Sequence, residues 1–155
     1  MMTVMTGTDS EETSIRKAEE ADFEMVFRLL EQLLNVGESL NKEELEQVFM
    51  HEIADKDSFS LCAWREQEIL GFLAGTICEN YLYSGRYLYV STLVVDKMHR
   101  GQHIGTLLLD TVIGEAKERG CRAVDLDSSF FRTASHEFYE HYGFRKRAFN
   151  FTMNI

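Results

Sequence analysis

Apolar residues recur every three or four positions in several stretches of the chain, and this spacing predicts helices. The first opens at Asp22 and the second at Asn41, where Glu44 completes a capping-box spacing. A third runs from Ile104 to a glycine that favours a left-handed cap, and a fourth covers residues 133–142. The apolar faces expected for the first three are Phe23, Val26, Phe27, Leu30 and Leu34; Leu45, Val48, Phe49 and Ile53; and Ile104, Leu107, Leu108, Val112, Ile113 and Ala116.

Apolar runs bounded by turn residues predict the strands. A turn at residues 66–68 joins two of them into an antiparallel hairpin, and residues 80–86 form a tyrosine-bearing loop before the next strand. The chain has no proline to interrupt these elements. The predicted strands are residues 14–17, 58–65, 69–78, 87–96 and 121–127, with a last strand or strand pair over residues 144–155.

The order of these elements sets the expected fold. One strand, two helices and three strands are followed by helix, strand, helix and strand, which predicts a mixed, mostly antiparallel sheet with helices on both faces. This is an α/β fold, or α+β by some conventions. The 155 residues are enough for one domain and too few for two ordinary ones. We therefore expect a flexible polar N-terminus over residues 1–13 and a single domain over residues 14–155.

Composition limits the classes of binding partner and the cellular compartment that we expect for this protein. Acidic residues outnumber basic ones by 26 to 16, giving a formal net charge of −10. This charge disfavours nucleic acid and anionic membranes and would attract cationic small molecules, although it would equally serve solubility alone. No apolar run approaches the roughly 20 residues of a membrane-spanning helix, and the polar start does not resemble a secretory signal. Three widely spaced cysteines without a CxxC pair argue against a disulfide framework and a zinc site, and favour the cytoplasm.

Candidate chemistry lies in residues 100–106, which join a predicted strand to the start of a predicted helix. The first N–H groups of a helix lack internal partners and carry partial positive charge, so such a turn holds a phosphate without a dedicated cation. Gly101 and Gly105 would let backbone amides approach a pyrophosphate closely. The segment has neither the spacing of a dinucleotide fingerprint nor the Gly-Lys-Ser/Thr of a P-loop, so it indicates another kind of phosphate turn.

Two blocks of residues carry a family resemblance. The first is Leu93-Val94-Val95 followed by Arg100-Gly101-Gln102-His103-Ile104-Gly105-Thr106-Leu107-Leu108, and the second is Phe138-Tyr139-Glu140 followed by Gly143-Phe144. In this order and separation they resemble the GNAT superfamily of N-acetyltransferases, in which a Gln/Arg-x-x-Gly-x-Gly/Ala turn binds the pyrophosphate of acetyl-CoA. The resemblance implies a GNAT-like domain that uses acetyl-CoA as acetyl donor. It also implies direct transfer, in a ternary complex, to a primary amine of a small molecule.

The turn departs from the GNAT pattern at one position. Arg100 and Gly105 match the two ends of the motif, while His103 occupies its central glycine. We expect the turn to be retained if the His103 backbone has ordinary helical dihedrals, because then only its amide is needed and its imidazole points outward.

The resemblance also assigns roles to the donor-binding residues. The strand before the turn splays from its neighbour and its backbone binds the pantetheine arm, the amides of residues 102–106 bind the phosphates, and the Arg100 guanidinium is a charged partner. Arg132 replaces an asparagine of the family and reaches either a phosphate or solvent. The implied acetyl-CoA contacts are Leu93, Val94, Val95, Arg100, Gly101, Gln102, His103, Ile104, Gly105, Thr106 and Arg132.

Tyr139 matches the family tyrosine that protonates the departing CoA thiolate. The base is less well defined, because many relatives place a glutamate on the central strand where this chain has Ser91 and Thr92. Glu79 and Asp127 are the candidates, acting directly or through water.

The acceptor cleft is expected between the tyrosine-bearing loop and the first two helices. There Tyr81, Tyr83 and Glu79 would hold a cation by their ring faces and charge. The histidines show no helical pairing with a nearby carboxylate, so no metal is expected.

Several alternatives stay open. The C-terminal stretch, with Arg132, Phe138-Tyr139, Phe149 and Phe151, is similar to aminoalkylphosphonate N-acetyltransferases. The segment at residues 83–86 is similar instead to diamine and aminoglycoside N-acetyltransferases. A protein or peptide N-acetyltransferase and a non-catalytic acyl-CoA-binding regulatory module are the rival functions. A homodimer is compatible with the sequence.

Overall fold

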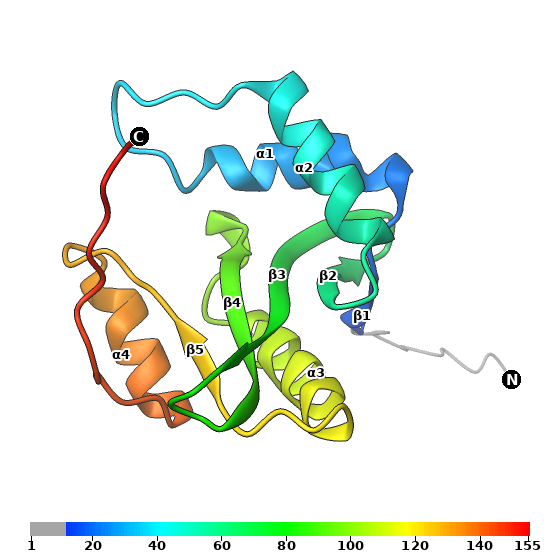
Figure 1. The fold of residues 1–155 in the computed structure, drawn as a ribbon. Coiled ribbons are helices and arrows are strands. Elements are labelled where there is room, and N and C mark those ends of the chain that lie inside the picture. The colour runs from blue at the N-terminus through cyan, green and yellow to red at the C-terminus, as the bar shows by residue number, and fades with distance from the viewer. Residues whose placement is uncertain (1–11) are drawn as a thin grey trace, which may run out of the picture.

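A five-stranded sheet organises the chain, with its strands side by side in sequence order (Figure 1). The computed structural model describes residues 12–155, so most of the segment expected to be a flexible N-terminus lies outside the described residues. The strands are β1 (Ser14–Lys17), β2 (Ser58–Arg65), β3 (Glu68–Asn80), β4 (Gly85–Val95) and β5 (Val124–Leu126). The helices are α1 (Phe23–Glu31), α2 (Lys42–Ala54), α3 (Ile104–Glu118) and α4 (Thr133–Tyr142), with 3-10 turns η1 (Glu20–Asp22) and η2 (Lys97–His99).

The sheet is mixed and mostly antiparallel. β1 to β4 pair antiparallel, and β5 pairs parallel to β4. One face is covered by α1 and α2, and the other by α3 with side chains of α4. Successive residues of β3 show why two cores form: Phe72 packs under α1 and α2, whereas Leu73 packs under α3. The predicted α/β fold with helices on both faces is confirmed.

Local signals fix where the helices begin and end. The Oδ1 atom of Asn41 accepts the backbone N–H of Glu44 at 3.0 Å, so Asn41 caps α2 as predicted. After α3 and α4, Gly120 and Gly143 have φ angles of +81° and +126°, which a glycine adopts without side-chain strain. These two glycines therefore end their helices, as the sequence indicates.

Some predicted core positions are wrong. Val48 and Leu107 are 54% and 38% exposed. Each directly precedes a buried core residue, Phe49 or Leu108, and neighbouring residues of a helix point about 100° apart. Leu34 also falls outside its predicted helix face, because α1 ends at Glu31.

The strand predicted over residues 144–155 is also wrong. These residues have no regular secondary structure. Their alternation of apolar and polar side chains indicates strand propensity, but a strand also needs a neighbour with which to exchange backbone hydrogen bonds, and no described strand pairs with this segment. Side chains fix it instead: Asn150 donates to Asp127, and the rings of Phe149 and Phe130 pair at 6.3 Å.

Candidate active site

β4 and β5 pair only over a short stretch and then separate. Their paired positions end at Val90 and Leu126, where β5 stops, while β4 continues to Val95. Figure 1 shows β5 leaning away from β4. A β-bulge marks the same place, because β3 pairs with Val90 and then with Thr92, which leaves Ser91 as an extra residue. A bulge bends and twists its strand, so the bulge and the short β5 together leave one edge of β4 open.

The open edge presents backbone hydrogen-bonding groups. In an antiparallel ladder, alternate residues direct their N–H and C=O groups to opposite sides. Asp96 donates its N–H to the carbonyl of Leu70 on the β3 side at 2.8 Å. Val94 therefore also points its backbone groups toward β3, and Leu93 and Val95 point theirs toward the open edge. Of the three strand residues predicted to meet pantetheine, Leu93 and Val95 have the backbone groups on the correct side.

The turn after β4 contains two residues with positive φ. Gly101 has a φ angle of +77°, and His103 has φ 63° and ψ 16°, in the left-handed region. The condition considered for His103, ordinary helical dihedrals, is therefore not met. The motif glycine stands where the turn needs a left-handed residue, and histidine adopts this conformation at a cost of about 1–2 kcal/mol. His103 is exposed and its side chain makes no capping hydrogen bond, which agrees with an imidazole directed outward.

The beginning of α3 offers backbone donors beside this turn. The first helical hydrogen bond runs from Leu107 N–H to the His103 carbonyl at 3.0 Å. The preceding amides of Ile104, Gly105 and Thr106 have no acceptor one turn back in the helix. Because the helix dipole adds partial positive charge at this end, these amides suit a phosphate or another anion.

Arg65, at the end of β2, ties this turn to the sheet. Its Nη1 donates to Oε1 of Gln102 at 2.9 Å, and its Nε and Nη2 donate to Oγ1 of Thr13 at 3.1 and 2.9 Å. The sequence gives no sign of this contact, because Arg65 and Gln102 are 37 positions apart and belong to no common motif. Arg100, predicted as a charged partner of the phosphates, directs its Nε toward the Val95 carbonyl at 3.5 Å, a long contact that leaves it easily redirected.

Gly105 connects the turn to α4. A Cβ atom at Gly105 would lie 3.2 Å from Cζ of Phe138, tighter than ordinary van der Waals contact. The missing side chain therefore makes room for an aromatic ring of α4, beyond any role in approaching a ligand. Tyr139 follows Phe138 on the same helix and packs its ring edge-on against Phe144 at 5.7 Å. The phosphate turn and Tyr139 are thus linked through one glycine–ring contact.

The electrostatics of Tyr139 suit a proton donor. Burial raises the pKa of Tyr139 above its ordinary value of 10.0, and the nearby positive charge of Arg132 opposes that increase. The hydroxyl therefore keeps its proton at neutral pH. Arg132 itself does not reach only solvent, because its Nη2 donates to the carbonyl of Leu33, just after α1.

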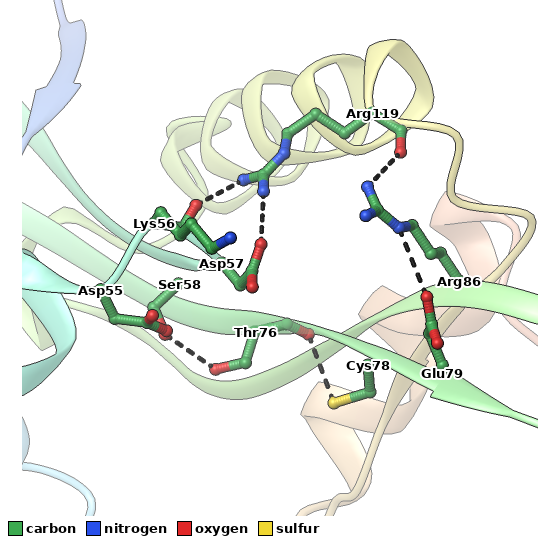
Figure 2. A network of polar contacts seen from close by, with 9 residues as sticks. All are labelled: Asp55, Lys56, Asp57, Ser58, Thr76, Cys78, Glu79, Arg86 and Arg119. Atoms are coloured by element: carbon green, nitrogen blue, oxygen red, sulfur yellow. Dashed lines mark hydrogen bonds and ion pairs between the residues drawn. The ribbon is translucent and has the colours of Figure 1, made fainter.

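The residues predicted to form the acceptor cleft do not come together. β3 and β4 extend further than predicted, so the tyrosine-bearing loop is a tight turn over residues 81–84. Tyr81 is fully exposed, and the Tyr83 hydroxyl donates to Asp125 at 2.6 Å. Glu79 pairs with Arg86 at 3.7 Å, in the network of Figure 2. From this turn to the far end of β4 is about 30 Å at 3.3 Å per residue, so it lies far from the phosphate turn.

Asp127 is the predicted acceptor residue that lies where β4 and β5 separate. It directly follows Leu126, the last paired residue of β5. Its Oδ2 accepts the Tyr89 hydroxyl at 2.7 Å and the Asn150 amide at 2.8 Å. The hydrogen bond to Asp127 raises the pKa of Tyr89 to about 12, so Tyr89 remains a donor. Asp127 is exposed and held in place by two side chains, an arrangement suited to receiving a cation.

Two further kinds of site are absent from the described chain. Within residues 12–155, no three His, Cys, Asp or Glu side chains gather as a metal site would require. No helix in the same range is both long enough and apolar enough to cross a membrane.

Comparison with known proteins agrees with this geometry. The sequence profile of the acetyltransferase (GNAT) family matches residues 16–144. Aminoalkylphosphonate N-acetyltransferase of Salmonella typhimurium is 27% identical over 139 residues, which are 89% of this chain and 88% of that protein. N-alpha-acetyltransferase 30 of Schizosaccharomyces pombe is 31% identical over 87 residues, which are 54% of this chain and 58% of the yeast protein.

Among solved structures, a transcriptional regulator from Bacillus halodurans C-125 has a TM-score of 0.83 and 28% identity, covering 93% of this chain and all of that one. The family match spans both the open edge of β4 and the helix of Tyr139. The chain belongs to the acetyltransferase (GNAT) family and is an N-acetyltransferase.

Proposed function

We propose that the chain transfers the acetyl group of acetyl-CoA directly to a primary amine of a small molecule within a ternary complex. The observation that carries the proposal is the meeting of three features: the open edge of β4, the amide-bearing start of α3, and Tyr139 linked to that start through Gly105 and Phe138. Each feature matches one part of the donor or one step of the transfer.

The residues present fit acetyl-CoA. The backbone groups of Leu93 and Val95 would hydrogen-bond the amides of the pantetheine arm, in the way that a neighbouring strand would. The pyrophosphate would lie on the amides of residues 102–106, where donors and helix dipole act together. Arg100 would exchange its long contact with Val95 for a charge-assisted bond to phosphate. Arg132, which donates to Leu33, would position α4 and not bind the donor.

The reaction needs one proton removed and one delivered. The amine nitrogen attacks the acetyl carbonyl carbon, a C–N bond forms, and the C–S bond breaks. The nitrogen loses a proton to Asp127, directly or through water, and the sulfur receives a proton from the Tyr139 hydroxyl. Positioned acids of this kind contribute roughly 10²–10⁴-fold to a rate. The raised pKa of Tyr139 keeps that proton available at neutral pH.

A small-molecule acceptor is favoured by the extent of the relationships. The match to the aminoalkylphosphonate enzyme spans 88% of that protein, whereas the match to the N-alpha-acetyltransferase spans 58% of the yeast protein. Both names describe amine acceptors, so the class of reaction is common to them. The three cysteines of the chain are free, which accords with a location of the protein in the reducing cytoplasm.

Release of CoA thiol, measured with acetyl-CoA and a panel of amines, aminophosphonates, polyamines and peptides, tests the proposal. We expect turnover with at least one small amine, and a 10²–10⁴-fold lower kcat for Tyr139→Phe. Tyr142→Phe is the matched control, because this tyrosine of the same helix bonds Asp110 and should leave kcat unchanged. CoA binding without turnover would favour a regulatory module, preference for peptides would favour a protein acetyltransferase, and absence of CoA binding would reject all three.

A further inference from the structure

Exposed aromatic rings gather beside the proposed acceptor carboxylate. Phe130 and Phe131 lie in the segment between β5 and α4, and Phe149 and Phe151 lie in the C-terminal segment. They are 81%, 63%, 75% and 93% exposed in that order. Single exposed apolar residues are normal, but Phe130 and Phe149 come from two different segments and contact each other, and neighbouring exposed apolar side chains of this kind can mark a binding surface.

The rings are fixed next to Asp127. Phe130 and Phe149 pair with their centroids 6.3 Å apart at 45°. Asn150, which follows Phe149, donates to Oδ2 of Asp127 at 2.8 Å. The Tyr89 hydroxyl donates to the same oxygen. Among the described residues no hydrogen bond reaches Oδ1 of Asp127, so this oxygen can accept from an ammonium group while the two side chains hold the carboxylate still.

Three of the four cations in residues 127–132 and 143–155 are paired within the chain, and Arg145 makes no hydrogen bond or ion pair with a described residue. Arg132 donates to the Leu33 carbonyl, Lys146 pairs with Glu140 at 2.9 Å, and Arg147 donates to the Tyr83 hydroxyl. An acceptor with a phosphonate or phosphate group would have to break one of these contacts or depend on Arg145 alone. An acceptor with an apolar group would instead cover exposed rings, which is favourable without any rearrangement.

We infer that the acceptor is a primary amine joined to an aromatic or other apolar group, with its nitrogen at Asp127 and its apolar group against Phe130 and Phe149. This inference rests on the proposed function. The nitrogen then lies where β4 and β5 separate, beside the bulge at Ser91, and the apolar group extends outward to the two rings. The acceptor is therefore chosen by the segment after β5 and by the C-terminal segment, and not by the tyrosine turn.

Steady-state acetyl transfer to amines that carry different apolar, anionic, cationic or peptide groups tests the inference. The panel is 2-phenylethylamine, ethylamine, 2-aminoethylphosphonate, spermidine and a short peptide with a free N-terminus. We expect kcat/KM for 2-phenylethylamine to exceed that for ethylamine by about 30-fold, from the transfer of one phenyl ring onto apolar surface. The value for 2-phenylethylamine should also exceed those for the other three acceptors.

The double variant Phe130→Ala with Phe149→Ala identifies the residues responsible. Both positions are exposed, so the domain should fold without the two rings, and the preference for 2-phenylethylamine over ethylamine should fall about tenfold. Leu82→Ala, an exposed apolar position in the tyrosine turn, is the matched control and should change nothing. Preference for the phosphonate, spermidine or the peptide, or an undiminished phenyl preference in the double variant, would overturn the inference while leaving acetyl transfer intact. Failure to acetylate any amine would overturn the proposed function as well.

Discussion

Replacing His103 by glycine should stabilise the protein without weakening donor binding. His103 has φ 63° and ψ 16°, a conformation that costs a residue with a Cβ about 1–2 kcal/mol. Glycine removes that strain, but it also gains freedom in the unfolded chain, which costs about 0.5–1 kcal/mol. The imidazole makes no capping hydrogen bond that would be lost. The difference lies between about 0 and 1.5 kcal/mol, so we predict a gain of about 0.75 kcal/mol in the free energy of unfolding.

Urea and thermal denaturation measure this gain. For a domain of this size, it corresponds to a rise in Tm of about 1–4 °C. Acetyl-CoA titration should give an unchanged Kd for His103→Gly, because the backbone amides stay in place. His103→Val is the opposite perturbation, since a β-branched residue resists positive φ, and it should lower both stability and affinity for acetyl-CoA.

Ser84→Gly is the matched control. Ser84 also has a positive φ, 52°, but lies in the turn between β3 and β4, away from the phosphate turn. Ser84→Gly should raise stability by less, because it also removes the hydrogen bond from Ser84 Oγ to the Tyr81 carbonyl at 3.4 Å, and it should leave acetyl-CoA binding unchanged. A loss of stability in His103→Gly would refute the reasoning, because the histidine side chain would then contribute more than the left-handed backbone costs.

Two further predictions concern α4. Gly105→Ala should raise KM for acetyl-CoA and lower kcat together, because its Cβ would lie 3.2 Å from Phe138. Adding Phe138→Leu should restore both constants in steady-state kinetics. If neither constant recovers, the contact with the ring is not the cause. The alkaline loss of kcat caused by Tyr139 should lie above pH 10, because burial raises its pKa above the ordinary 10.0 and only the protonated form donates. The limb caused by Tyr139 is identified by its absence from the pH–rate profile of Tyr139→Phe. A midpoint of this limb below pH 10 would contradict the assignment.

Much of the fold can be predicted from the sequence because its signals are local. The strand and helix patterns, the cap at Asn41 and the glycines after α3 and α4 each depend on residues a few positions apart. The core errors at Val48 and Leu107 come from the exact rotation of a helix against the sheet, which periodicity sets only coarsely. The error at residues 144–155 arises because strand propensity does not supply a pairing partner.

The site was predictable only in part, for similar reasons. The phosphate turn and Tyr139 lie in contiguous motifs, and the structure links them through Gly105. Arg65 with Gln102, and Asp127 with Asn150, are contacts 37 and 23 positions apart that no local pattern reveals. The left-handed backbone of His103 was also not predictable, because histidine is enriched among left-handed residues but adopts positive φ in only a small fraction of cases.

The most direct test of the central claim is a structure of the chain with CoA bound. The account predicts the pyrophosphate within hydrogen-bonding distance of the amides of residues 102–106, the pantetheine arm along Leu93 and Val95, and the sulfur near the Tyr139 hydroxyl. CoA bound elsewhere, or a sulfur remote from Tyr139 while the phosphates occupy the turn, would contradict it.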